Sequence, residues 1–185
     1  MQPTRWRMAR ALTGRCNGDM SFLRTASLIA ATVTTGLTAG LFTAFAYAVM
    51  PGLSRTDDRT LVLAMQRINE SILNGWFAVC FGGALVFTLL AAVSHLGAGH
   101  RAVLPWIVAA LLLYVVVLGV TAVVNVPLNN VLAQAGDVDR VADLAGLRER
   151  FEAAWVRGNV IRAIASTGAF GLLTWALVGL GRLSG

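Results

Sequence analysis

Residues 106–124, WIVAALLLYVVVLGVTAVV, decide the fold of this chain, because they contain no charged side chain and are apolar on every side. A helix at the surface of a soluble protein has one polar face, whereas a helix surrounded by lipid is apolar all round. Residues 79–93 have the same character. Crossing the hydrocarbon core of a bilayer takes roughly 20 such residues, so both stretches are predicted to lie in transmembrane helices.

Four long segments of the chain lack Asp, Glu, Lys and Arg altogether. They lie between Arg24 and Arg55, between Glu70 and Arg101, between Arg101 and Asp137, and between Arg162 and Arg182. Each segment is long enough for one membrane span, and none comfortably holds two. We therefore predict an all-α, integral membrane four-helix bundle whose spans lie at residues 27–49, 75–96, 105–126 and 159–180.

The segments outside these spans are polar. Residues 1–19 form an Arg-rich tail that we expect to be disordered, and residues 20–185 form the membrane domain, with Met1 and Met20 as alternative starts. The apolar stretch after the tail is too long for a signal peptide, so we expect it to remain as the first span. Residues 57–70 carry apolar side chains at helical spacing, which predicts a short amphipathic helix of the kind that lies in the membrane interface.

The formal net charge of +6 comes from 15 Arg against nine acidic residues, with no Lys. The Arg residues are spread over the tail and the loops, so we expect no nucleic-acid binding and attribute them to the positive-inside bias of membrane proteins. Seven Arg lie at each end of the predicted bundle, and eight of the nine acidic residues lie at one end. We expect a multi-pass protein of the cell membrane with both termini in the cytoplasm.

The two cysteines, Cys16 in the tail and Cys80 in the second span, cannot build a disulfide framework. No nucleotide-binding, metal or haem motif is visible in the sequence. We therefore expect neither a metal nor a cofactor. The lipid bilayer is the expected partner, and the sequence leaves the oligomeric state open.

Polar side chains inside apolar spans are energetically unfavourable, so each needs a reason. Residues 125–129, NVPLN, place two Asn side chains on one helix face, although the Pro between them is expected to break the end of the third span. Trp155, Asn159 and Arg162 share a face in the same way. Either the amides cap a helix end and Arg162 reaches back to water, or these side chains line a polar pocket in which Arg162 binds an anionic or enolate oxygen.

Neighbouring spans of the bundle run antiparallel, so the end of span three and the start of span four meet at one membrane face. The end of span one and the start of span two lie at the same face, as does the charged connector at residues 137–157, which we expect to be helical. We therefore predict one pocket there. The candidate catalytic residues are Arg162, Asn159, Asn125 and Asn129, and the candidate substrate-binding residues are Trp155, Gln66, Asn69, Met50 and Phe77.

Several short motifs follow one another along the chain. They are residues 39–42 (AGLF), 49–53 (VMPGL) and 64–69 (AMQRIN), Phe77, residues 125–129 (NVPLN), and the spaced set Trp155, Asn159 and Arg162. With these motifs the sequence resembles the anthrone-oxygenase-like membrane proteins, a family long known only as a domain of unknown function. The resemblance implies a membrane-bound, cofactor-independent oxygenase of the kind that converts anthrones to anthraquinones. Our leading hypothesis is therefore a cofactor-independent monooxygenase that acts on a lipophilic phenolic or anthrone-like substrate.

The oxidation of an anthrone requires particular chemical groups in the active site. The acidic carbon of an anthrone forms an enolate with the ring ketone, so an enzyme needs a base or a strong enolate stabiliser, and access for oxygen. The spans contain no Asp, Glu or Lys, so the base would be a connector carboxylate such as Glu152, or water. The alternative function is a non-catalytic membrane module that binds a lipid, a quinone or a partner protein. A proton-coupled exporter is less favoured, because it would normally need a carboxylate inside the membrane.

Overall fold

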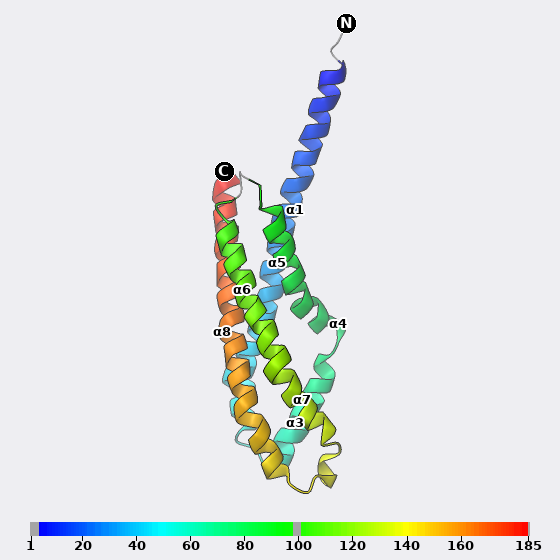
Figure 1. Ribbon diagram of the computed structural model, residues 1–185, viewed down its shortest axis with the longest axis vertical. Coiled ribbons are helices and arrows are strands. Elements are labelled where there is room, and N and C mark those ends of the chain that lie inside the picture. Colours follow the sequence, from blue (N-terminus) through cyan, green and yellow to red (C-terminus); the bar gives the residue numbers. More distant parts are fainter. Residues whose placement is uncertain (1–3, 98–100, 185) are drawn as a thin grey trace.

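The computed structural model describes residues 4–97 and 101–184, and within them the chain is helical and contains no strand (Figure 1). Four helical segments are long and apolar enough to cross a membrane: Met20–Leu53, Gly75–Ser94, Leu104–Gln134 and Leu144–Arg182. The prediction of an all-α bundle with four membrane spans is therefore confirmed.

The first span combines α1 (Thr4–Ala44), the π-helical turn η1 (Phe45–Val49) and α2 (Met50–Leu53). Helix α1 begins at Thr4, so the structure is helical where we expected a disordered tail. The division into a tail and a membrane domain stays a prediction.

Prolines in two spans each follow a π-helical turn by two residues. Pro51 follows η1, and Pro127 follows η4 (Thr121–Asn125) within α7 (Val126–Gln134). A proline ring clashes with the carbonyl four residues earlier and supplies no N–H group. In both spans that carbonyl lies inside the π-helical turn, whose wider winding relieves the clash. The expectation that Pro127 breaks the third span is therefore wrong, because the helix continues to Gln134.

The connection between spans one and two contains α3 (Asp58–Ile72), which confirms the predicted amphipathic helix. Asp57 caps it by accepting a hydrogen bond from the main-chain N–H of Thr60 at 3.0 Å. Its buried side chains pack with residues of α7 and α8 (Leu144–Ser184), among them Leu132 and Phe151. The apolar face of α3 therefore faces protein, where we had expected an interfacial helix exposed to lipid.

The second span runs through α4 (Gly75–Phe77), the π-helical turn η2 (Ala78–Gly82) and α5 (Gly83–Ser94). The third begins with α6 (Leu104–Val120) and continues through η4 and α7. After the short 3-10 helix η5 (Val138–Arg140), the helical part of the connector and the fourth span form the single helix α8.

Helix α8 packs along both α1 and α6, and α1 also packs against α5. Gly36 allows the close approach of α1 and α8, because a Cβ atom there would lie 2.9 Å from the ring of Phe170. Small residues commonly let membrane helices approach in this way. Gly40 has open space around its Cα atom, so only the first glycine of the Gly36–Gly40 pair has this role.

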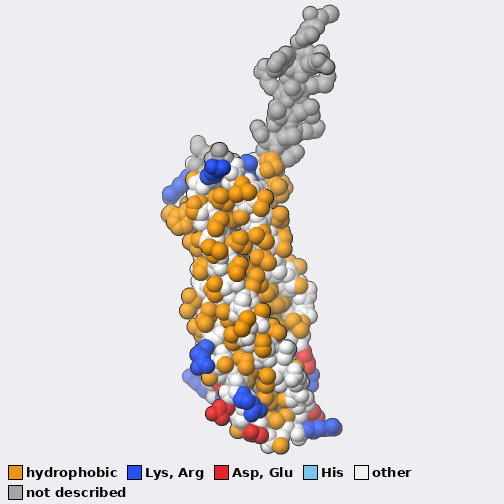
Figure 2. Space-filling view, viewed as in Figure 1, with side chains coloured by type: hydrophobic (Ala, Val, Ile, Leu, Met, Phe, Trp, Pro, Cys, Tyr) orange, Lys and Arg blue, Asp and Glu red, His pale blue; other side chains and the backbone are white. Residues whose placement is uncertain are grey.

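Figure 2 shows an apolar middle with charged side chains gathered at the two ends of the bundle. Arg side chains mark the end where α1 enters and α8 finishes, whereas Arg, Asp and Glu are mixed at the opposite end. This distribution is typical of a protein that spans a membrane. Which side of the membrane each end faces stays a prediction.

Candidate functional site

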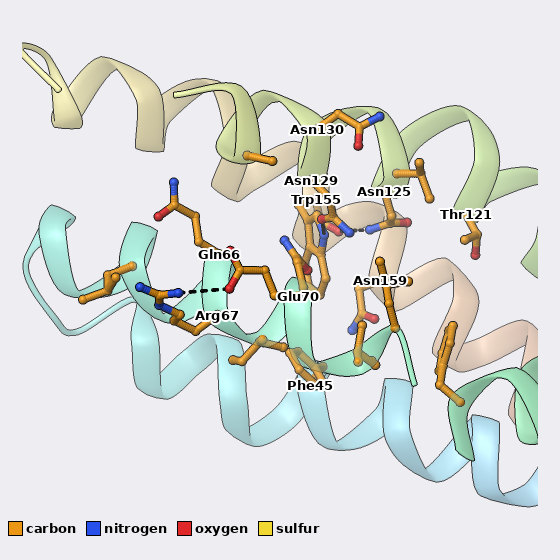
Figure 3. A pocket seen from close by; sticks show the side chains of 18 of the residues that line it. Phe45, Gln66, Arg67, Glu70, Thr121, Asn125, Asn129, Asn130, Trp155 and Asn159 are labelled. Atoms are coloured by element: carbon orange, nitrogen blue, oxygen red, sulfur yellow. Dashed lines mark hydrogen bonds and ion pairs between the residues drawn. The ribbon is translucent and has the colours of Figure 1, made fainter. Parts of the chain in front are cut away.

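A cavity of about 690 Å³ lies between α3, α7 and the first half of α8, at the end of the bundle where acidic and basic side chains are mixed. Its walls also include residues of α1, η1 and α4. Figure 3 shows Asn125, Asn129, Trp155 and Asn159 grouped on one side of it, with Gln66, Arg67 and Glu70 coming from α3. The end of span three and the start of span four therefore lie together at one end of the bundle, as predicted.

Arg162 lies deep in this cavity and is only 6% exposed. One terminal nitrogen (Nη2) donates to Oδ1 of Asn159 at 3.0 Å, and the other (Nη1) lies 3.5 Å from Oγ1 of Thr121. The guanidinium carbon lies 4.2 Å from the ring centroid of Phe42 and 5.5 Å from that of Trp155, which are cation–π distances. Among residues 4–97 and 101–184, no carboxylate forms an ion pair with Arg162.

Asn159 positions this guanidinium and is itself held by the backbone. Its Nδ2 group donates to the main-chain carbonyl of Phe42 at 2.9 Å, close to the π-helical turn η1. Its Oδ1 atom then faces Arg162, because the amide nitrogen is already engaged. A buried arginine held by amide and aromatic groups does not reach back to water, which disfavours the snorkelling interpretation of Arg162.

Besides the contact between Arg162 and Thr121, two hydrogen bonds join the third span to α8. Asn125 Nδ2 donates to the main-chain carbonyl of Trp155 at 3.1 Å, and Trp155 Nε1 donates to Oδ1 of Asn129 at 2.7 Å. Gly158 makes this approach possible, because a Cβ atom there would lie 2.8 Å from Asn125 Oδ1. Asn129 therefore orients the Trp155 ring, Asn125 holds the main chain of α8, and both line the cavity.

Three buried polar atoms of cavity-lining residues have no hydrogen-bond partner: Arg162 Nε, Asn125 Oδ1 and Asn69 Nδ2. Leaving a buried donor or acceptor unpaired typically costs about 1–3 kcal/mol, more for a charged group. Native proteins keep few such groups, and their gathering around one cavity indicates a site for a polar ligand atom. The set contains two donors and one acceptor.

The outer part of the cavity is organised by Gln66. Its Nε2 group donates to the main-chain carbonyls of Leu132 at 2.7 Å and Gly136 at 2.9 Å, which joins α3 to the end of α7. Gly136 has a φ of 71°, the left-handed conformation that commonly follows a helix. Glu70 and Arg67 form an exposed ion pair of 3.1 Å nearby, seen as a dashed line in Figure 3.

The structure brings together eight of the nine residues that the sequence suggested. Lining the cavity are Arg162, Asn159, Asn125, Asn129, Trp155, Gln66, Asn69 and Phe77. Met50 lies outside the cavity and packs in the core with Leu61 and Phe151. Glu152, considered above as a base, also lies outside it and accepts a hydrogen bond from Arg148 at 2.6 Å.

The cavity also contains residues that are not among the nine candidates from the sequence, notably Phe42, Phe45, Thr121 and Glu70. Thr121 could have been noticed, because it is a polar residue in an otherwise apolar stretch. The sequence places Glu70 on the amphipathic helix, but the direction in which its side chain points depends on how α3 packs. Phe42 and Phe45 look like ordinary lipid-facing or core residues in sequence.

Comparison with known families identifies the chain. The sequence model of the anthrone oxygenase family matches residues 75–172, more than half of the chain. The chain belongs to the anthrone oxygenase family. The matched range holds all four candidate catalytic residues of this anthrone oxygenase family member, whereas Gln66 and Asn69 precede it. Searches of the curated proteins and of the solved structures found no match.

Proposed function

We propose that this anthrone oxygenase family member is a cofactor-independent monooxygenase of the membrane that oxidises a lipophilic phenolic or anthrone-like substrate in the cavity. The observation that supports this most is Arg162, a buried cation with no carboxylate partner in the described part of the chain and with an unpaired Nε atom. A fixed cation in a site shielded from water stabilises negative charge that develops during a reaction.

The expected ligand fits the cavity in size and chemistry. Pockets for small molecules are typically about 300–1,000 Å³ and mostly apolar, with a few polar groups that set the orientation. In the proposed binding mode the ketone oxygen of the anthrone faces Arg162. Phe42 and Trp155 lie within cation–π distance of the same guanidinium, so flat aromatic surfaces surround the place where the ring system would bind.

The first chemical step removes a proton from the acidic carbon opposite the ketone. Electron density moves to the ketone oxygen and gives an enolate whose charge Arg162 would stabilise. Two carboxylates line the cavity, Glu70 and Asp137. Asp137 already accepts a hydrogen bond from the main chain of Asp139 at 3.1 Å and faces Arg140. Glu70, which lines the cavity from α3 and pairs with the neighbouring Arg67 at 3.1 Å, is the proposed general base.

Oxygen then reacts with the electron-rich carbanion without a cofactor. One electron passes to O₂, and the resulting carbon radical and superoxide combine to form a C–O bond. Protonation gives a hydroperoxide. Loss of the second proton from the same carbon, with cleavage of the O–O bond, produces the new ketone and water. One anthrone and one O₂ thus yield one anthraquinone and one water.

The test is oxygen consumption by the purified full-length protein in lipid nanodiscs, with anthrone as substrate. We expect one anthraquinone per O₂ consumed, no accumulation of hydrogen peroxide, and a rate well above that of empty nanodiscs, which report spontaneous oxidation. Binding of anthraquinone without any increase in oxygen consumption would instead support the non-catalytic binding module.

A further inference from the structure

A second, smaller cavity of about 230 Å³ adjoins the first. The two cavities share Leu41, Ile72 and Phe77, which therefore form the wall between them. The outer part of the second cavity includes Leu37, Trp76 and Cys80, and we call this cavity the vestibule. Three apolar side chains are thus common to the vestibule and to the cavity that contains Arg162.

The vestibule lies at the outer surface of the bundle, beside helical segments that are long and apolar enough to span a membrane. Leu37 is 55% exposed and Trp76 is 79% exposed, and both belong to helical segments that can span the membrane. Helix α3 ends at Ile72 and α4 begins at Gly75, and Figure 1 shows α4 standing away from the other helices. Asn74 maintains this break by donating to the carbonyl of Ser71 at 2.8 Å and accepting from the N–H of Phe77 at 3.0 Å.

A row of aromatic rings leads from the shared wall to the cation. Phe77 stacks on Phe81 with ring centroids 5.0 Å apart, and Phe81 meets the edge of Phe42 at 6.2 Å. Phe42 in turn lies 4.2 Å from the guanidinium carbon of Arg162. Phe77 and Phe42 line the main cavity, whereas Phe81 lines neither cavity and packs against the core. Flat aromatic molecules pack favourably against rings such as Phe77 and Phe42 by stacking and edge contacts.

We propose that a planar aromatic substrate reaches the cavity from within the bilayer, through the vestibule and past Phe77, and that the product leaves by the same route. The identity of this ligand rests on the proposed function. The other opening of the cavity is polar and carries Arg67, Glu70 and Asp137. A lipophilic molecule would have to leave the bilayer to use it, at a cost in free energy that grows with the apolar surface returned to water.

The first experiment compares the same substitution at two lipid-facing positions. Leu37→Trp narrows the vestibule without touching the main cavity, whereas Leu112→Trp adds the same side chain on α6, at a position 62% exposed and outside both cavities. The full-length protein is placed in lipid nanodiscs, and a fluorescent hydroxyanthraquinone serves as the probe. Stopped-flow fluorescence gives its association and dissociation rate constants.

If the vestibule is the route, Leu37→Trp lowers both rate constants about tenfold, equivalent to about 1.4 kcal/mol added to the barrier, and leaves Kd unchanged. Leu112→Trp then behaves like the wild type. Unchanged rate constants for Leu37→Trp, or a change in Kd without slower exchange, would overturn the proposed route.

The second experiment uses Cys80 in a Cys16→Ser background, so that it is the single thiol. A membrane-soluble maleimide should label Cys80 faster than a charged, water-soluble maleimide, and bound hydroxyanthraquinone should slow the labelling. Equal labelling by the two reagents would show that the vestibule opens to water and would overturn the route. If the wild type binds no hydroxyanthraquinone but Cys80 is still labelled from the bilayer, the substrate class in the proposed function fails and the lipid-facing route stands.

Discussion

The guanidinium of Arg162 donates to the side-chain oxygen of Asn159, one helical turn earlier in α8, at 3.0 Å. Asn159 donates in turn to the main-chain carbonyl of Phe42 at 2.9 Å, so the cation is tied through one amide to the opposite wall of the cavity. A positively charged group held in this way needs little rearrangement when negative charge develops next to it.

Arg162→Lys should impair oxygenase activity even though it keeps the charge. Lys lacks the planar fork that contacts Asn159 and the ring of Phe42 together, so we expect kcat/KM to fall about 10²–10³-fold, as for loss of an oxyanion-stabilising donor. Arg157→Lys, an exposed position on the same helix, is the control and should leave activity unchanged. Full activity of Arg162→Lys would remove the central residue of the proposed site.

Gly158→Ala should separate α8 from the third span. The added Cβ atom would lie 2.8 Å from Asn125 Oδ1 and 3.0 Å from a methyl group of Val124, so we expect a loss of about 1–3 kcal/mol from overpacking. Gly171→Ala in the same helix has open space and should be neutral. Thermal unfolding in detergent measures both variants, and equal melting temperatures would contradict the close contact.

Glu70→Gln tests the proposed base. The amide cannot accept the substrate proton, so turnover should fall about 10²–10⁴-fold while the affinity for anthraquinone changes little. Glu149→Gln, an exposed carboxylate of α8 outside the cavity, is the matched control. Comparable oxygen consumption by Glu70→Gln and the wild type would assign the proton transfer to another group or to water.

The ion pair between Arg59 of α3 and Asp139 of η5 should make stability depend on pH. The hydrogen bond and charge of Arg59 hold the pKa of the Asp139 carboxyl below its ordinary value of 3.8. A lowered pKa in the folded state means that the stabilisation is present above 3.8 and is lost as the pH falls through the lowered value. The difference in melting temperature between wild type and Asp139→Asn should therefore vanish in acid.

The pair is exposed, so the difference in melting temperature will be small at neutral pH and smaller in high salt. A difference that persists unchanged in acid would show that the ion pair is not its source.

The sidedness of the bundle can be checked with reporter fusions. Fusions after Leu53, Gly97 and Gly136 and at the carboxy terminus should alternate between the two sides of the membrane, with the last one in the cytoplasm. A cytoplasmic location of the fusion after Leu53 would reverse the expected orientation without changing the four spans.

The amino-acid sequence is sufficient to predict the membrane bundle and much of the site. Charge-free apolar segments of sufficient length are typical of membrane spans. In hydrocarbon such a segment forms a helix, because unpaired backbone groups are too unfavourable there. Because neighbouring spans run antiparallel, Asn125 and Asn129 lie at the same end of the bundle as the residues at the start of the fourth span, Trp155, Asn159 and Arg162. Their shared helix faces follow from spacings of three and four residues, which local geometry dictates.

Which other side chains complete the cavity depends on how the helices pack in three dimensions. A π-helical turn adds one residue to the winding and so rotates the following helix face by about 100°. Met50 directly follows η1, so its direction into the core could not be derived from regular helical spacing. Phe42, Thr121 and Glu70 come from three different segments of the chain, and only the packing of α1, α3 and η4 around α8 brings them together. The vestibule likewise depends on where α4 stands relative to α1, which no local pattern specifies.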